Sequence, residues 1–120
     1  MTELTIRVSQ SDGSVPITVL HVAGDLDADT YQDLDAKATE ATDGGAQNII
    51  LDLSGINYMS SAGFRSVHLI YMAVKGSPGP GPHLRLVCPT ESTQRMMKTM
   101  GFDTYIPVHK EMREAVDAFA

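Results

Sequence analysis

The first twenty-odd residues alternate between apolar and polar positions in the way that strands do. Leu4, Ile6 and Val8 alternate with polar residues, which is the period of a half-buried strand. The run ITVLHVA, residues 17–23, carries apolar residues on both faces and predicts a second strand. SDGS, residues 11–14, supplies a turn between them. The pattern therefore predicts a hairpin.

Two units that each pass from strand to helix follow the hairpin. An apolar stripe at helical spacing runs through residues 31–42, and DGG, residues 43–45, ends that helix in the manner of a glycine cap. NIILDLSG, residues 48–55, is a short, nearly continuous apolar run typical of a central strand. The helical spacing then returns in Phe64, Val67, Tyr71 and Val74.

The last third of the chain again alternates strands with helices, and these elements are shorter. The Pro/Gly-rich residues 76–82 predict a mobile loop, and residues 83–88 predict a strand. A short helix is expected over residues 91–100, followed by an edge strand over residues 104–108 and a closing helix over residues 112–119. Strands and helices that alternate in this way favour parallel neighbours, joined by right-handed crossovers and covered by helices.

Length and composition limit the possible classes of protein. A chain of 120 residues fits one α/β domain, residues 1–120, with room for a single core. Nine basic and fifteen acidic residues give a net charge of −6, which disfavours nucleic acid and anionic lipid as direct partners. The single cysteine, Cys88, and the lack of a signal-peptide pattern or a membrane-spanning run lead us to expect a cytoplasmic protein.

Ser60 and Ser61 invite a serine hydrolase interpretation, which the spacing does not support. A nucleophilic serine needs a base within about 3 Å. His68 is the nearest in sequence, but seven residues along one helix amount to a rise of about 10.5 Å. His21 sits inside a strand pattern, and the G-x-S-x-G elbow is absent.

The aspartates of DLDAD, residues 25–29, suggest a cation site only weakly. An EF-hand loop needs Gly at its sixth position and Glu at its twelfth, where this chain has Thr30 and Ala36. We interpret Asp25 and Asp29 as helix-capping charges, and no histidine has metal-ligand spacing. A magnesium-dependent phosphatase using Asp25 and Asp27 is the remaining enzyme alternative.

Three segments together resemble the STAS domain of bacterial anti-sigma factor antagonists: VAGDLDADT, IILDLSGINYMSSAGFRSV and LRLVCPTESTQRMMKTMGFDTYIPV. The resemblance implies a mixed sheet of four or five strands flanked by about four helices. It implies that Ser61 accepts a phosphate from a partner that is both kinase and anti-sigma factor, and that Asp27 helps partner recognition. Ser60 stands where relatives often have an acid, and Ala62 stands where they often have Ser or Thr.

The implied function is that of a binding protein without enzyme activity, cofactor or metal. The unphosphorylated form would capture the anti-sigma factor and release a sigma factor, phosphorylation of Ser61 would end the capture, and a separate phosphatase would restore it. A STAS scaffold or ligand sensor without a phosphorylation cycle is the alternative. We expect a monomer.

The physical chemistry of a helix start is compatible with this role. Free backbone N–H groups and the helix dipole favour an anion there, so phosphate at Ser61 should not unfold the protein. The alternative is that Ser60 or Ser61 only caps the helix. Phe64, Val67 and Tyr71 are expected in the core, and so are at least two of Met96, Met97 and Met100. We expect the partner to contact Met59, Ser60, Ala62, Gly63, Arg65 and Ser66.

Overall fold

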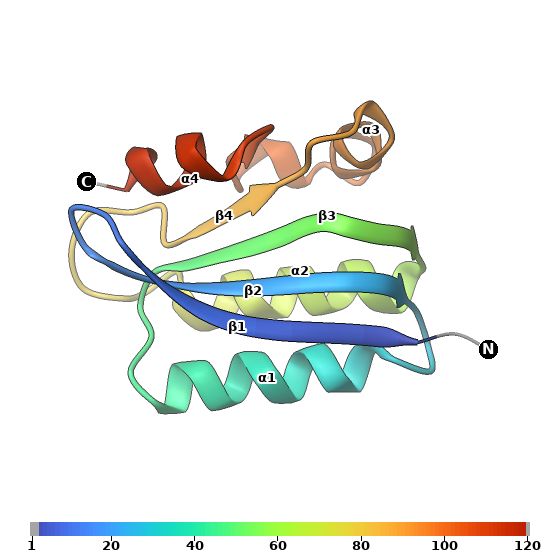
Figure 1. The fold of residues 1–120 in the computed structure, drawn as a ribbon, viewed down its shortest axis with the longest axis horizontal. Helices are drawn as coiled ribbons and strands as arrows, with labels where there is room; N and C mark the ends of the chain where they lie inside the picture. Colours follow the sequence, from blue (N-terminus) through green and yellow to red (C-terminus); the bar gives the residue numbers. More distant parts are fainter. Residues whose placement is uncertain (1–2, 120) are drawn as a thin grey trace.

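The computed structural model describes residues 3–119 as one five-stranded sheet with helices on both faces (Figure 1). The strands follow chain order across the sheet: β1 (Leu4–Asp12), β2 (Pro16–Leu26), β3 (Ile49–Met59), β4 (Leu84–Val87) and β5 (Val108–His109). The helices are α1 (Tyr31–Asp43), α2 (Ser61–Val74), α3 (Glu91–Thr99) and α4 (Met112–Ala118), with a 3₁₀ turn, η1 (Phe102–Thr104). The predicted α/β class, mixed sheet and four helices are confirmed.

The connections also follow the prediction. β1 pairs antiparallel with β2, while β2, β3, β4 and β5 are parallel neighbours. The Pro/Gly-rich residues 76–82 form an irregular connection between α2 and β4. The parallel order places the carboxyl ends of β2 and β3 side by side, where Leu26 pairs with Met59. Functional side chains of an open α/β sheet gather at this kind of edge.

Helices α1 and α2 cover one face of the sheet and enclose the main core, and α4 lies on the other face (Figure 1). Leu20, Leu51 and Leu86 contribute to the main core and are fully buried. Each such side chain stabilises the fold by about 1.5–3 kcal/mol. A smaller cluster lies beneath α4 and includes Ile50 and Phe119.

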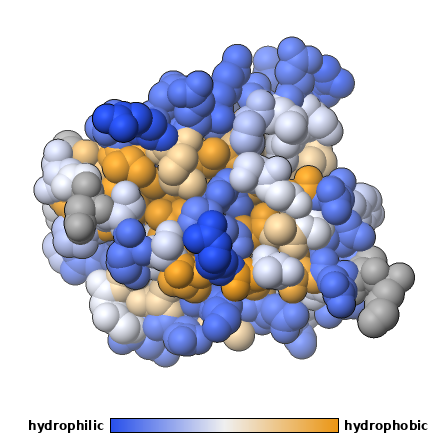
Figure 2. Space-filling model, in the orientation of Figure 1, coloured by the Kyte–Doolittle hydropathy of each residue, from blue (hydrophilic) through white to orange (hydrophobic). Residues whose placement is uncertain are grey.

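Surface hydropathy follows this layering. On the face seen in Figure 2, apolar surface runs along the middle of the molecule, where the strands lie, and hydrophilic side chains cover the margins above and below. Val8 of the edge strand β1 is 44% exposed. Part of this edge strand's apolar surface therefore remains open to solvent.

The strands β2 and β3 run further than predicted, because β3 bulges. Between the pairs His21–Asp52 and Ala23–Gly55, β3 contains one residue more than β2, and a second shift follows at Asp25. Bulges bend a strand without ending it. Residues 56–59, which were not predicted as strand, therefore stay in the sheet as far as Met59.

Two other predictions need correction near the end of the chain. The edge strand expected over residues 104–108 is present as β5, but it begins only at Val108, because Thr104 ends η1 and residues 105–107 are irregular. Of Met96, Met97 and Met100, only Met97 is core, because Thr93 and Met97, one helical turn apart, are the buried residues of α3. Met96 is half-buried and Met100 is 47% exposed, so the expectation of two core methionines was wrong.

Candidate functional site at the carboxyl edge of the sheet

The start of α2 is tied directly to the end of β2. After β3 ends at Met59, Ser60 takes an extended conformation (φ −94°, ψ 178°), and the helix begins at Ser61. The backbone N–H of Ser60 donates to the carbonyl oxygen of Leu26 at 2.9 Å. The first helical hydrogen bond runs from the N–H of Phe64 to the carbonyl of Ser60 at 3.1 Å. This turn is therefore held by backbone bonds on both sides.

Gly63 allows α2 to approach β2 this closely. A Cβ at this position would lie 2.8 Å from the carbonyl oxygen of Leu26 and 2.9 Å from its Cγ. Gly63 is buried, so the free protein offers little of it for the predicted contact with a partner. Its role in this geometry is to set the position of the helix start.

The two serines have different surroundings. The hydroxyl oxygen of Ser60 is buried and has no hydrogen-bond partner within residues 3–119, and it makes no capping bond to the helix. Ser61 is exposed, and the described part of the chain gives its side chain no hydrogen bond either. Only Ser61 therefore presents a hydroxyl to an incoming protein.

The first turn of α2 suits an anion. It contains no acidic residue, and the leading N–H groups of a helix lack partners inside the helix. Those groups and the helix dipole attract negative charge. The capping alternative fails for the side chains of this serine pair, because Ser60 is the N-cap by backbone geometry alone.

Asp27 lies in a braced turn beside this helix start. Its Oδ1 accepts the backbone N–H of Asp29 at 2.9 Å, and its own N–H donates to the Thr30 hydroxyl at 3.0 Å. That hydroxyl donates to the carbonyl of Asp25 at 2.7 Å. Asp27 comes directly after Leu26 in the chain, and Ser61 comes directly after Ser60. Because a backbone hydrogen bond joins Leu26 and Ser60, Asp27 and Ser61 lie at the same edge of the sheet.

The capping interpretation of the neighbouring aspartates is wrong. Thr30 is the N-cap of α1, and its side chain makes no bond to the helix. The carboxylate of Asp27 is used within its own turn, and neither Asp25 nor Asp29 caps α1. Backbone carbonyls bind the N–H groups at the start of α1 instead: Tyr31 donates to Asp27 and Asp33 donates to Thr30.

The predicted contact residues divide by exposure. Arg65 is exposed one turn after Ser61, and Ala62 is half-buried. Met59 is 5% exposed but lines a groove beside α3. Ser66 is fully buried and cannot touch a partner, so that expectation was wrong. The contact of Gly63 with Leu26 turns the face containing Ser66 toward the sheet.

One polar network on the opposite face of the sheet was missed by sequence reasoning. The Ser9 hydroxyl lies 2.9 Å from His21 Nε2, and His21 Nδ1 lies 2.7 Å from Asp52 Oδ2. Asp52 Oδ1 accepts the backbone N–H and the hydroxyl of Ser54 at 3.0 and 2.7 Å. Burial alone raises the pKa of Asp52, but the hydrogen bonds from Ser54 and His21 outweigh it, and the net pKa lies below the ordinary value.

The order Ser9–His21–Asp52 is that of a hydrolytic triad, but the setting does not suit acyl transfer. Ser9 lies inside β1, and backbone amides of a strand point within the plane of the sheet while side chains stand off it. No pair of donors is thereby directed at an oxyanion near this hydroxyl. The network instead links β1, β2 and β3, and Asp52 satisfies the N–H group that the bulge at Ser54 frees.

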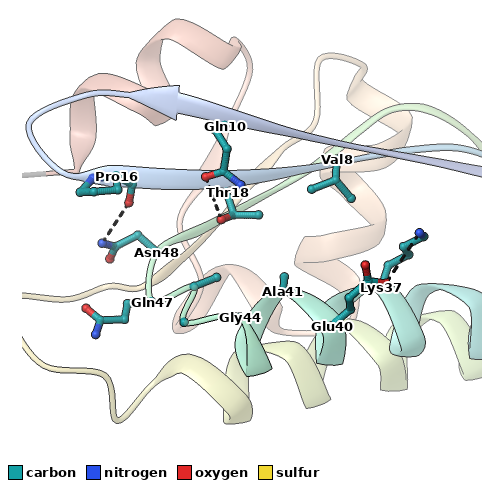
Figure 3. A pocket seen from close by; sticks show the side chains of 12 residues that line it. Val8, Gln10, Pro16, Thr18, Lys37, Glu40, Ala41, Gly44, Gln47 and Asn48 are labelled. Carbon is teal, nitrogen blue, oxygen red and sulfur yellow. Dashed lines mark hydrogen bonds and ion pairs between the residues drawn. The ribbon is translucent and has the colours of Figure 1, made fainter.

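A large surface hollow, about 630 Å³, lies at the other end of the sheet, between β1, β2 and the end of α1 (Figure 3). Its polar groups largely satisfy one another. The Thr18 hydroxyl donates to Gln10 Oε1 at 3.3 Å, and the Asn48 amide donates to the carbonyl of Pro16 at 3.5 Å (Figure 3). Lys37 Nζ lies 3.8 Å from Glu40 Oε2 (Figure 3). Size alone therefore does not make this hollow a functional site.

Other reactive groups are either buried or isolated. Burial, with a smaller contribution from Asp52, raises the pKa of the Cys88 thiol to about 12, so this thiol stays protonated.

Within residues 3–119 no three His, Cys, Asp or Glu side chains come together as a metal site. None of the helices in that same range is both long and apolar enough to cross a membrane.

Comparisons with known proteins agree with this architecture. The fold is similar to that of an anti-sigma factor antagonist from Mycobacterium paratuberculosis, with a TM-score of 0.82 and 22% identity over 97% of this chain and 93% of that one. It is also similar to the Bacillus cell fate determinant SpoIIAA in its phosphorylated form, with a TM-score of 0.70 and 18% identity over 97% of this chain and 100% of that one. No protein of curated function matches the sequence. The STAS domain model matches residues 6–115, and the chain therefore belongs to the STAS domain family.

Proposed function

We propose that this STAS domain is a cytoplasmic anti-sigma factor antagonist that is switched off by phosphorylation of Ser61. The unmodified protein binds an anti-sigma factor with serine kinase activity, which transfers phosphate from ATP to Ser61 and then dissociates. A separate phosphatase restores the binding form. The protein acts by binding and performs no catalysis of its own.

The observation that carries this proposal is the exposed hydroxyl of Ser61 at the first position of α2, beside a helix start fixed by Leu26 and Gly63. Two structures with similar folds belong to anti-sigma factor antagonists, and SpoIIAA is known in phosphorylated and unphosphorylated forms. The neighbouring Ser60 hydroxyl is buried, so it is less accessible to a kinase than that of Ser61.

Electrostatics explain how a phosphate at Ser61 can act as a switch. Phosphate adds about −1.5 to −2 charges at neutral pH, beside the half-buried Asp27. A partner that packs closely on the neutral hydroxyl must then desolvate that charge or repel it. A cost of about 3 kcal/mol weakens binding by somewhat more than a hundredfold. The fold is retained, because the helix start accepts an anion.

The test is a binding titration with the anti-sigma factor kinases of the source organism, each purified separately. Unmodified protein and Ser61→Ala should bind one of them, and Ser61→Asp should bind it more than about a hundredfold more weakly. Ser14→Asp is the matched control, since Ser14 is exposed in the turn between β1 and β2 and should tolerate the same charge.

Two results would overturn the proposal. If no anti-sigma factor binds the unmodified protein, a STAS scaffold or ligand sensor becomes the better description. If Ser61→Asp binds as tightly as Ser14→Asp, the contact exists but Ser61 is not its switch. Magnesium-dependent hydrolysis of phosphomonoesters that is lost in Asp27→Asn would favour the enzyme alternative.

A further inference from the structure

A second surface feature lies directly beside the helix start. A groove of about 360 Å³ runs between the beginning of α2 and the outer face of α3. Its lining consists of Met59, Phe64, Ser92, Arg95, Met96, Thr99 and Met100. Met59 precedes the two serines in the chain and Phe64 follows them. A protein that covers Ser61 therefore also meets the edge of this groove.

The apolar part of the groove is unusual for a solvent-exposed surface. Met96 of α3 and Met100, the C-cap residue that follows this helix, are one helical turn apart, and both line the groove. Methionine side chains are flexible and polarizable, and protein surfaces that adapt to a bound side chain use them often. Met100 is 47% exposed, so much of its apolar side chain is open to solvent at the groove.

Charge at the groove points to the kind of partner. Arg95 lines it and Arg65 stands one turn after Ser61, and both are exposed. Within residues 3–119 neither arginine forms an ion pair, although the chain as a whole carries a charge of −6. A basic, apolar groove on an acidic protein is complementary to an apolar side chain flanked by a carboxylate.

We infer that this groove is the second contact of the same anti-sigma factor, holding an apolar side chain of the partner between Phe64 and Met100 while a partner carboxylate pairs with Arg95. The inference rests on the proposed function and adds a specificity contact to it. Ser61 decides whether the partner binds, and the groove decides which partner fits. Apolar anchors in pockets, ringed by polar contacts, are the usual source of such selectivity.

The test uses the same purified anti-sigma factor and two pairs of variants. Met100→Glu should weaken binding about tenfold or more, while Met72→Glu should leave the dissociation constant within about twofold. Met72 is a fair control because it is 44% exposed, also lies on a helix, and stands about 16 Å along α2 from Ser61. Arg95→Glu should weaken binding by a similar factor, whereas Lys110→Glu, exposed and outside the groove, should not.

The outcomes distinguish failure of this inference from failure of the proposed function. If Ser61→Asp abolishes binding while Met100→Glu and Arg95→Glu behave like their controls, the function stands and the groove contact is wrong. If Met100→Glu instead dissociates a dimer of the free protein in sedimentation experiments, a second copy fills the groove and the inference is overturned. If no anti-sigma factor binds the unmodified protein, both proposals fail. Unchanged thermal midpoints confirm that the variants are folded.

Discussion

Two serine-containing regions of this molecule differ in how their polar atoms are satisfied. In the network of Ser9, His21 and Asp52, each side chain bonds to the next, and Ser54 completes the carboxylate's partners. At the start of α2, neither Ser60 nor Ser61 makes a side-chain hydrogen bond within residues 3–119. The first region has the hydrogen-bond order of a catalytic triad, yet its bonds hold neighbouring strands together.

This comparison shows that a network of hydrogen-bonded side chains is a weaker sign of function than an exposed polar group that a partner can reach. A paired, half-buried network contributes to the stability of the sheet. An exposed hydroxyl on a rigid turn contributes little to stability, so its position there needs another explanation. The same reasoning sets the large hollow of Figure 3 aside, because its polar groups are paired, and directs attention to the smaller groove beside Ser61.

The largest expected effect on stability tests what keeps the second region rigid. Gly63→Ala places a Cβ within 3 Å of the Leu26 backbone, so the first turn of α2 must move. We expect the free energy of unfolding to fall by up to about 3 kcal/mol, with weaker partner binding as Ser61 shifts.

Urea denaturation and the binding titration measure both effects of Gly63→Ala. Gly76→Ala is the control, since a Cβ there meets no heavy atom within 4 Å and should change stability by less than about 0.5 kcal/mol. Equal stability of the two variants would show that α2 does not depend on close contact with β2.

A smaller effect tests the brace in the first region. Asp52→Asn removes a carboxylate held by Ser54 and His21, and we expect a loss of about 1–2 kcal/mol at pH 7. Because the pKa of Asp52 is lowered in the folded state, its contribution is present above the ordinary value of about 3.9 and is lost as pH falls through the lowered value.

The difference in the free energy of unfolding between wild type and Asp52→Asn should therefore have its full size at pH 7 and shrink below about pH 4. Urea denaturation at several pH values measures it. Asp103→Asn, at an exposed position in η1, should show no such gap. A difference that grows toward low pH would mean that the folded state does not favour the ionised form of Asp52.

The smallest effect compares the two serines themselves. Replacing an N-cap serine usually costs about 1 kcal/mol. Ser60→Ala should cost less than about 0.5 kcal/mol or even stabilise the fold, because its buried hydroxyl bonds to nothing in the described residues. Thr90→Ala is the matched comparison: its hydroxyl accepts the N–H of Thr93 at 3.2 Å, and the usual loss is expected. Thermal unfolding of both variants checks the contrast.

The sequence predicted much of the fold because its signals are local. Alternation in β1 and the apolar run of β3 each depend on neighbours within a few positions. Predictions failed where distant contacts decide. Gly63 against Leu26 sets the rotation of α2, so Ser66 turns inward. The bulges of β3 carry the strand on to Met59 through polar residues.

The candidate site was found only in part for the same reason. A resemblance to a known family, and not periodicity, directed attention to Ser61. Nothing local marks His21 and Asp52, which are 31 residues apart, as hydrogen-bonded partners. The groove depends on which methionines of α3 face outward, and a helix of nine residues gives too short a pattern to decide that.

Phosphate mapping by mass spectrometry, after incubation with the anti-sigma factor kinase and ATP, is the most direct test of the claim that exposure selects Ser61. The account predicts one phosphate, on Ser61, which is lost in Ser61→Ala and unchanged in Ser60→Ala. Phosphate on Ser60, or on neither serine with a kinase that binds the unmodified protein, would contradict it.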